Sequence, residues 1–350
     1  MWQIEGHERV VRSLQRAVAT GRIAHAYLFA GPPHIGKTTL AITLAQALNC
    51  AQPDPPCGTC NSCRKIARGI HPDVQFIGPA EDRARHAPGQ GRPDAQRSRS
   101  RRKRVRQDLI PIDDIRAMQR SVALSSLEGQ WKVVVVAGAE RMTVEAANAL
   151  LKTLEEPPAH VVLALTTTDA GLLLPTIVSR CRVVPMPRLS RNQVETALRE
   201  RWEAEPAQAH LLAALSGGRL GWAVQTLQDQ TILAEREENL RLLAQALDAG
   251  PAQRLALAGE LAQGFAQRRA EVLNMLQVWL GWARDLWLLS LGCPERIVNI
   301  DQEVTLQARA QRVDVQPARS LVLALRDTQR QLDQNVNPRL ALEVLLLSMP

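Results

Sequence analysis

Runs of consecutive apolar residues mark the first half of the chain. Three such runs are Ala26–Ala30, Val133–Val136 and Val161–Leu165. Uninterrupted apolar runs of this length are typical of strands in a parallel sheet that is covered on both faces. The pattern therefore predicts three buried strands before about Pro187.

Helical spacing follows the first run and separates the other two. Leu40, Leu44 and Leu48 recur every four residues, which predicts a helix over 38–48. A second helix is predicted over 144–154, where Glu156-Pro157-Pro158 ends it. Strands that alternate with helices indicate an α/β nucleotide-binding domain over residues 1–187.

After Pro187 the strand signals fade, and apolar residues recur every three or four positions. Glycine and proline interrupt this pattern at Gly217-Gly218, Gly250-Pro251, Gly292 to Pro294 and Asn337-Pro338. The spacing predicts a small helical domain over 188–228 and an all-α bundle over 229–350. The bundle is expected to pack against itself and against partner subunits.

A phosphate-binding motif lies between the first strand and the first helix. Residues 31–38, GPPHIGKT, match G-x-x-x-x-G-K-[ST]. Glycines allow backbone N–H groups to close around phosphate oxygens at a helix N-terminus. A chance glycine-rich turn is the alternative, but the flanking strand and helix favour ATP or ADP with Mg²⁺. The predicted nucleotide-binding residues are Gly31, Gly36, Lys37, Thr38 and Thr39, with Lys37 at the β and γ phosphates and Thr38 at magnesium.

Hydrolysis normally needs two acids at the end of a neighbouring strand, one for the metal shell and one for the attacking water. Here the second strand continues as Ala137-Gly138-Ala139-Glu140, without acids at the first two positions. Glu140 is either recruited to the site or a solvated residue that opens the next helix. The sequence predicts nucleotide binding with weak or no turnover by the chain alone.

Four of the six cysteines lie within fourteen residues, with the spacing C-x6-C-x2-C-x2-C. Four thiolates satisfy tetrahedral zinc and leave no open position, so the predicted role is structural Zn²⁺ in a module over 50–63. A disulfide pair and an iron–sulfur site are the alternatives. The predicted ligands are Cys50, Cys57, Cys60 and Cys63.

Positive charge is concentrated in one segment. Between Arg83 and Arg106 there are ten Lys or Arg residues and one Asp, a local charge of +9 against +8 for the whole chain. This segment is poor in apolar residues, which predicts a flexible basic insert at about 80–107. It either contacts DNA phosphates or is a solvated tail.

Two further features bear on location. Arg284 and Asp285 interrupt the most apolar stretch, 272–291, which argues against a membrane span. The N-terminus lacks the pattern of a secretory signal, so a cytoplasmic location with reduced thiols is expected.

Together these features resemble the AAA+ subunits of the bacterial sliding-clamp loader, the γ/τ and δ′ family of the DNA polymerase III holoenzyme. The resemblance runs nearly end to end. It is most specific at residues 21–29 before the loop, the cysteine cluster, residues 147–158 and Ser179-Arg180-Cys181. It implies a P-loop AAA+ domain with a zinc module, then a small helical lid domain and an all-α C-terminal collar domain.

In that family the Ser-Arg-Cys arginine is an arginine finger that acts in trans, and Arg180 matches it. Without the family resemblance, Arg180 would be interpreted as a surface residue that forms an ion pair. The motor subunits of that family carry Asp-Glu at the position of Ala137-Gly138 and an arginine near Gly221. This chain lacks both features, so it resembles the δ′ members more than the motor subunits. Thr167 and Thr168 match the polar sensor, and Arg219 could compensate for Gly221 by a change of register.

The resemblance implies a hetero-oligomer with γ/τ-like and δ-like subunits. The sliding clamp and primed DNA would be reached through that complex. A self-sufficient γ/τ-like ATPase motor is the main alternative. A nucleic-acid-binding module that acts through the basic insert is a third possibility.

Overall fold

The computed structural model describes residues 2, 4–79, 82–83, 86, 109–334 and 336–350. The chain divides into two units, residues 1–189 with 219–221 and residues 190–218 with 222–350. Most of the predicted basic insert lies outside the described residues. The predicted division at 187 and 228 into three domains remains a prediction.

A five-stranded parallel sheet forms the centre of the first unit, with the order β2-β3-β4-β1-β5. The strands are β1 (Ala26–Ala30), β2 (Val74–Ile77), β3 (Lys132–Val136), β4 (Val161–Thr167) and β5 (Arg182–Pro185). This confirms the three predicted strands and the α/β class. The two edge strands, β2 and β5, are shorter and less apolar, and β5 buries only Val184.

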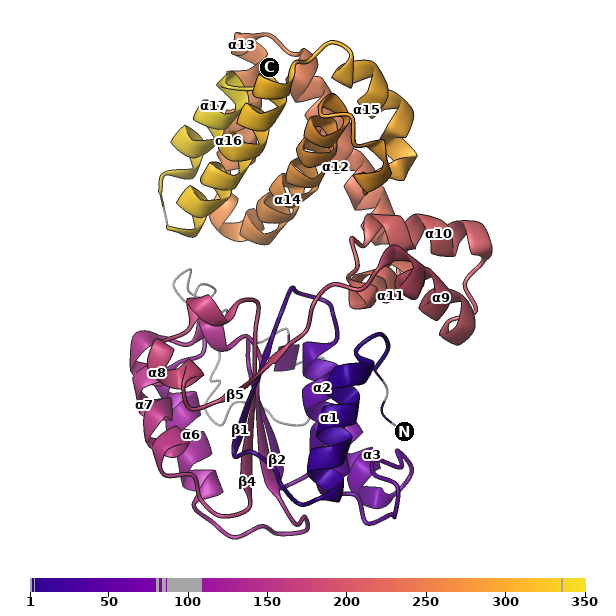
Figure 1. Ribbon diagram of the computed structural model, residues 1–350. Helices are drawn as coiled ribbons and strands as arrows, with labels where there is room; N and C mark the ends of the chain where they lie inside the picture. The colour runs from indigo at the N-terminus through magenta and orange to yellow at the C-terminus, as the bar shows by residue number, and fades with distance from the viewer. Residues whose placement is uncertain (1, 3, 80–81, 84–85, 87–108, 335) are drawn as a thin grey trace. The chain divides into compact units, whose positions relative to one another are not determined.

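Helices cover both faces of this sheet (Figure 1). One side carries α1 (Glu8–Ala19), α2 (Lys37–Leu48) and α3 (Asn61–Ala67), and the other α6 (Ile112–Val122), α7 (Val144–Glu155) and α8 (Pro175–Val178). Successive side chains of a strand point to opposite faces. Tyr27 and Phe29 therefore pack in the core with α2, whereas Leu28 packs in the core with α6 and α7.

Short 3₁₀ turns follow two of the strands at their carboxyl ends. They are η1 (Ala139–Arg141) after β3 and η2 (Ala170–Leu172) after β4. Because parallel strands end at one edge, these turns lie at the same edge as the phosphate loop after β1.

The described residues after Leu189 contain helices and turns but no strands, as the spacing predicts. The α-helices are α9 (Arg191–Arg201), α10 (Pro206–Leu215), α11 (Leu220–Gln228), α12 (Thr231–Asp248), α13 (Pro251–Ala262), α14 (Phe265–Ser290), α15 (Glu303–Ala310), α16 (Val315–Asp333) and α17 (Pro338–Leu347). Two 3₁₀ turns, η3 (Pro294–Arg296) and η4 (Ile300–Gln302), join α14 to α15.

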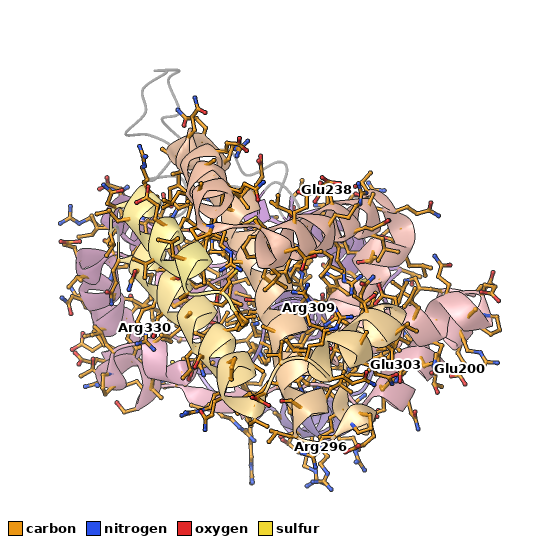
Figure 2. The ribbon with its side chains drawn as sticks, turned by 90° about the horizontal axis from the view of Figure 1, so that it is seen from above. Glu200, Glu238, Arg296, Glu303, Arg309 and Arg330 are labelled. Atoms are coloured by element: carbon orange, nitrogen blue, oxygen red, sulfur yellow. The ribbon has the colours of Figure 1, made fainter. Side chains whose placement is uncertain are left out.

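The core of the second unit forms around α14. Trp279 is fully buried and donates its indole N–H to the Asn239 carbonyl at 2.7 Å. Asp285, also fully buried, accepts hydrogen bonds from the N–H groups of Val298 and Asn299 and pairs with Arg284. Charged side chains such as Glu238 and Arg330 remain exposed (Figure 2). Among the described residues, no helix has the length and apolarity that crossing a membrane requires.

Asp73, just before β2, holds the turn that leads into β3. Its carboxylate is buried and accepts hydrogen bonds from the N–H groups of Leu127, Glu128 and Gly129 at 2.7–2.8 Å. Burial raises the pKa of Asp73, but the three N–H groups outweigh it and hold the pKa below the ordinary 3.8. The ionised carboxylate therefore stabilises the folded state.

We expect Asp73→Ala to lower the free energy of unfolding by about 2 kcal/mol, because three backbone N–H donors lose their charged acceptor. Urea denaturation measures this. Because the pKa is depressed, the stabilisation is present above pH 3.8 and lost as the pH falls further. Asp113→Asn, an exposed acid of α6, serves as the control. Equal stability of Asp73→Ala and wild type would contradict the role of this carboxylate.

Candidate nucleotide and metal sites

The phosphate loop joins β1 to α2, and two of its residues must be glycine. A Cβ on Gly31 would lie 2.1 Å from the carbonyl oxygen of Met186, the residue after β5, so there is no room for a side chain. Gly36 has a φ of 95°, a left-handed conformation that favours glycine. The backbone can therefore turn sharply into α2.

Lys37 begins α2 with its side chain folded over the loop. It is 9% exposed, and its ammonium donates to the carbonyls of Gly31 and Pro32 at 2.6 Å each. Burial lowers the pKa of Lys37 to about 8, although Glu140 and Asp82 act in the opposite direction. The cation lies where phosphate oxygens would meet the N-terminus of α2.

The other predicted nucleotide residues lie on the first turn of α2. Thr38 is half-buried and Thr39 is exposed. The first N–H groups of a helix have no intrahelical acceptor, and they carry the positive end of the helix dipole. The loop brings Gly31, Gly36, Lys37, Thr38 and Thr39 together at the start of α2, where backbone N–H groups of the kind that bind phosphate are found.

The carboxyl end of β3 carries no acid pair, but it contacts the end of β4. The Gly138 N–H donates to the Thr166 hydroxyl at 3.1 Å. Glu140 accepts from both the N–H and the hydroxyl of Thr168, at 3.2 and 3.0 Å. Glu140 is thus half-buried and bonded to the predicted sensor strand, not simply solvated.

A backbone contact occupies the position where motor subunits are expected to carry an arginine. The Gly221 N–H donates to the His34 carbonyl of the phosphate loop at 2.7 Å. A Cβ at Gly221 would lie 2.6 Å from that oxygen. Arg219, two residues earlier, is half-buried, and its pKa is lowered by burial and by Arg188.

The four clustered cysteines converge on one point. Their sulfur atoms all lie within 4.8 Å of one another. Four ligands at about 2.3 Å from a tetrahedral zinc ion would be separated by roughly 3.8 Å, so the cluster fits zinc with small adjustments. Cys60 also caps α3 by accepting from the Cys63 N–H, and Gln46 of α2 donates to the Cys63 carbonyl.

Protonation differs within the cluster. The N–H group of Cys60 and hydrogen bonds from Thr59 lower the pKa of Cys57 to about 6, whereas burial raises the pKa of Cys63 to about 12. A bound zinc ion would favour the thiolate form of every ligand.

Arg180 lies between α8 and β5, with its guanidinium held by two acceptors. Nη1 donates to the Thr176 carbonyl at 3.0 Å, and Nη2 forms an ion pair with Glu155 at 2.8 Å. The Arg180 side chain remains 36% exposed.

The geometry thus combines a P-loop, a cysteine cluster and a partly exposed arginine after α8. Comparison with known families matches both halves of the chain. The family described as "DNA polymerase III, delta subunit" matches residues 6–190, more than half of the chain. The family described as "DNA polymerase III, delta subunit, C terminal" matches residues 225–349. The chain belongs to the DNA polymerase III delta-prime family. It is a clamp-loader subunit of the delta-prime and gamma/tau type.

Relatives of this delta-prime family member include both kinds of subunit. DNA polymerase III subunit delta′ of Bacillus subtilis is 26% identical over 97% of this chain and 95% of its own length. Subunit delta′ of Pseudomonas aeruginosa is 36% identical over 65% of this chain and 64% of its own. Subunit tau of Escherichia coli is 36% identical over 65% of this chain but only 32% of its own length.

Two contacts in this delta-prime family member could not be predicted from the sequence pattern. Glu140 and Thr168 are 28 residues apart, and Glu155 and Arg180 are 25 apart. Neither pair forms a motif. The pairing of β3 with β4 brings Glu140 to Thr168, and the packing of α7 against α8 brings Glu155 to Arg180.

We expect Cys60→Ser combined with Cys63→Ser to remove bound zinc, because two oxygen ligands cannot replace two thiolates in a tetrahedral sulfur site. Metal analysis of the purified chain measures this, with one zinc per chain expected for wild type. Cys293→Ser, outside the cluster, should retain full zinc content. Zinc-free wild type, or zinc retained by the double variant, would contradict the assignment.

Proposed function

We propose that the chain is a non-motor, delta-prime-like subunit of the replicative clamp loader. It binds ATP or ADP with Mg²⁺ at residues 31–39 and donates Arg180 to the nucleotide of an adjacent ATPase subunit. The observation that carries this proposal is the position of Arg180, which is held far from the phosphate loop of its own chain.

The strand register supports action in trans. Arg182, the first residue of β5, pairs with Tyr27, and Gly31 follows four residues later, directly after β1. Four residues of strand correspond to about 13 Å. Glu155, which holds Arg180, ends a helix that runs about 18 Å from its start beside η1. The Arg180 guanidinium therefore lies at the opposite end of the sheet from Lys37.

An arginine suits this role because its planar fork presents several donors to phosphate oxygens and keeps its charge at any physiological pH. In phosphoryl transfer such a cation stabilises the charge that develops on the transferring group. The exposed edge of Arg180 is available to a neighbouring subunit.

The chain's own nucleotide site is suited to binding. Lys37 and the N–H groups at the start of α2 would neutralise phosphate charge, and the Thr38 hydroxyl would serve as a magnesium ligand. Magnesium would supply further positive charge to the phosphate oxygens. The absence of acids at Ala137 and Gly138 favours retention of nucleotide over its hydrolysis.

The partners follow from the family. We propose a cytoplasmic hetero-oligomer with gamma/tau-like and delta-like subunits, in which the helices of 229–350 form the collar and the sliding clamp and primed DNA are reached through the complex. The tau relatives contain a segment similar to residues of this chain, which supports assembly of related subunits.

A self-sufficient ATPase motor is the second candidate, and Glu140 is the observation that favours it. Its charge acts on Lys37, and its carboxylate reaches the end of β4. Steady-state turnover by the purified chain, abolished by Lys37→Ala, would establish that alternative. The non-motor proposal predicts negligible turnover.

ATP affinity should fall as the pH rises through about 8, since the Lys37 ammonium loses its charge there. One unit above this pKa, about tenfold weaker binding is expected. Titration with a fluorescent ATP analogue at pH 7 and pH 9 measures the effect. Lys37→Arg keeps its charge and should show a flatter profile, so equal pH dependence in the two proteins would refute the role of Lys37.

Arg180→Ala should reduce hydrolysis at the adjoining site by about a thousandfold in the reconstituted complex. Single-turnover ATP hydrolysis with primed DNA and the clamp measures this. Arg182→Ala, which changes an exposed arginine two residues away that contacts Ser13, is the matched control. An Arg180→Ala complex that assembles and hydrolyses ATP like wild type excludes the arginine-finger role.

A further inference from the structure

Arg180 is held by acceptors from two separate segments. Thr176, one helical turn earlier, supplies a backbone carbonyl, and Glu155 supplies a carboxylate from the end of α7. The hydrogen bond at Nη1 and the ion pair at Nη2 restrict the orientation of the guanidinium, although its long side chain has many rotamers.

The location of Glu155 is unfavourable for helix stability. It is the last residue of α7, where the helix dipole is negative and an acidic side chain is disfavoured. Its side chain is 50% exposed, so its ion pair with Arg180 adds little to stability. Fold stability therefore does not explain a carboxylate at this position.

The two contacts leave other N–H groups of the Arg180 guanidinium available for hydrogen bonds to a ligand. An arginine has five N–H groups; one on Nη1 donates to the Thr176 carbonyl, and Nη2 forms the ion pair with Glu155. Further N–H groups remain for phosphate oxygens, so the ion pair need not break when Arg180 meets a nucleotide. Glu155 can stay paired with one edge of the Arg180 guanidinium while the other edge faces the neighbouring subunit.

We propose that Glu155 is a positioning residue that orients Arg180 for action on the adjacent subunit's nucleotide. This inference rests on the proposed function, because it assigns Glu155 a role only through Arg180. Pre-orientation lowers the entropy cost of placing the cation on the transition state. Pre-orientation by Glu155 should therefore raise kcat and leave the nucleotide affinity unchanged.

The test uses the complex reconstituted with motor subunits, the clamp and primed DNA. We expect Glu155→Ala to lower kcat for ATP about two- to fivefold with KM unchanged, in line with the strength of an exposed ion pair. Glu155→Gln keeps an acceptor oxygen and should recover part of the loss. Glu156→Ala, at the exposed adjacent acid, should match wild type. Melting temperature and complex assembly should be the same for Glu155→Ala and wild type.

A double-mutant cycle separates the two hypotheses. In the Arg180→Ala background, Glu155→Ala should have no further effect on kcat. If Arg180→Ala lowers kcat but Glu155→Ala does not, or if their effects are additive, the positioning role is wrong while the arginine finger stands. If Arg180→Ala itself has no effect on kcat, the proposed arginine-finger function is wrong, whatever the effect of Glu155→Ala.

Discussion

The parallel pairing of β1 between β4 and β5 is the constraint on which the nucleotide-binding unit depends. It places the phosphate loop at the carboxyl end of a buried central strand, and the Met186 carbonyl that follows β5 presses against Gly31. The same pairing places the Thr167 carbonyl within reach of the Gly31 N–H. The loop is thus anchored on both sides by backbone groups, and α2 can direct its N-terminus at a ligand.

The pairing also separates the two charged groups that matter most. Lys37 lies at the carboxyl edge of the sheet, and Arg180 comes before the amino end of β5. The strand register therefore places the two cations toward opposite edges of the sheet.

Several parts of this arrangement could be predicted from the residues themselves. The apolar runs at β1, β3 and β4 are long enough to stand out, and the glycines and lysine of the loop form a local motif. The edge strands β2 and β5 could not be predicted with the same ease, since one face of an edge strand is partly exposed. The contacts of Glu140 with Thr168 and of Glu155 with Arg180 could not be predicted, because each joins residues that are distant in the sequence.

The sequence by itself determined the chemistry that depends on short spacing: the phosphate loop, the four clustered thiols and the helical second half. These are local because a turn, a metal cage or a helix is built from neighbouring residues. Only the tertiary structure decided the partners of Glu140, Gly221 and Arg180. Those contacts depend on strand order and on where a helix ends, and both are set by the packing of distant segments into one core.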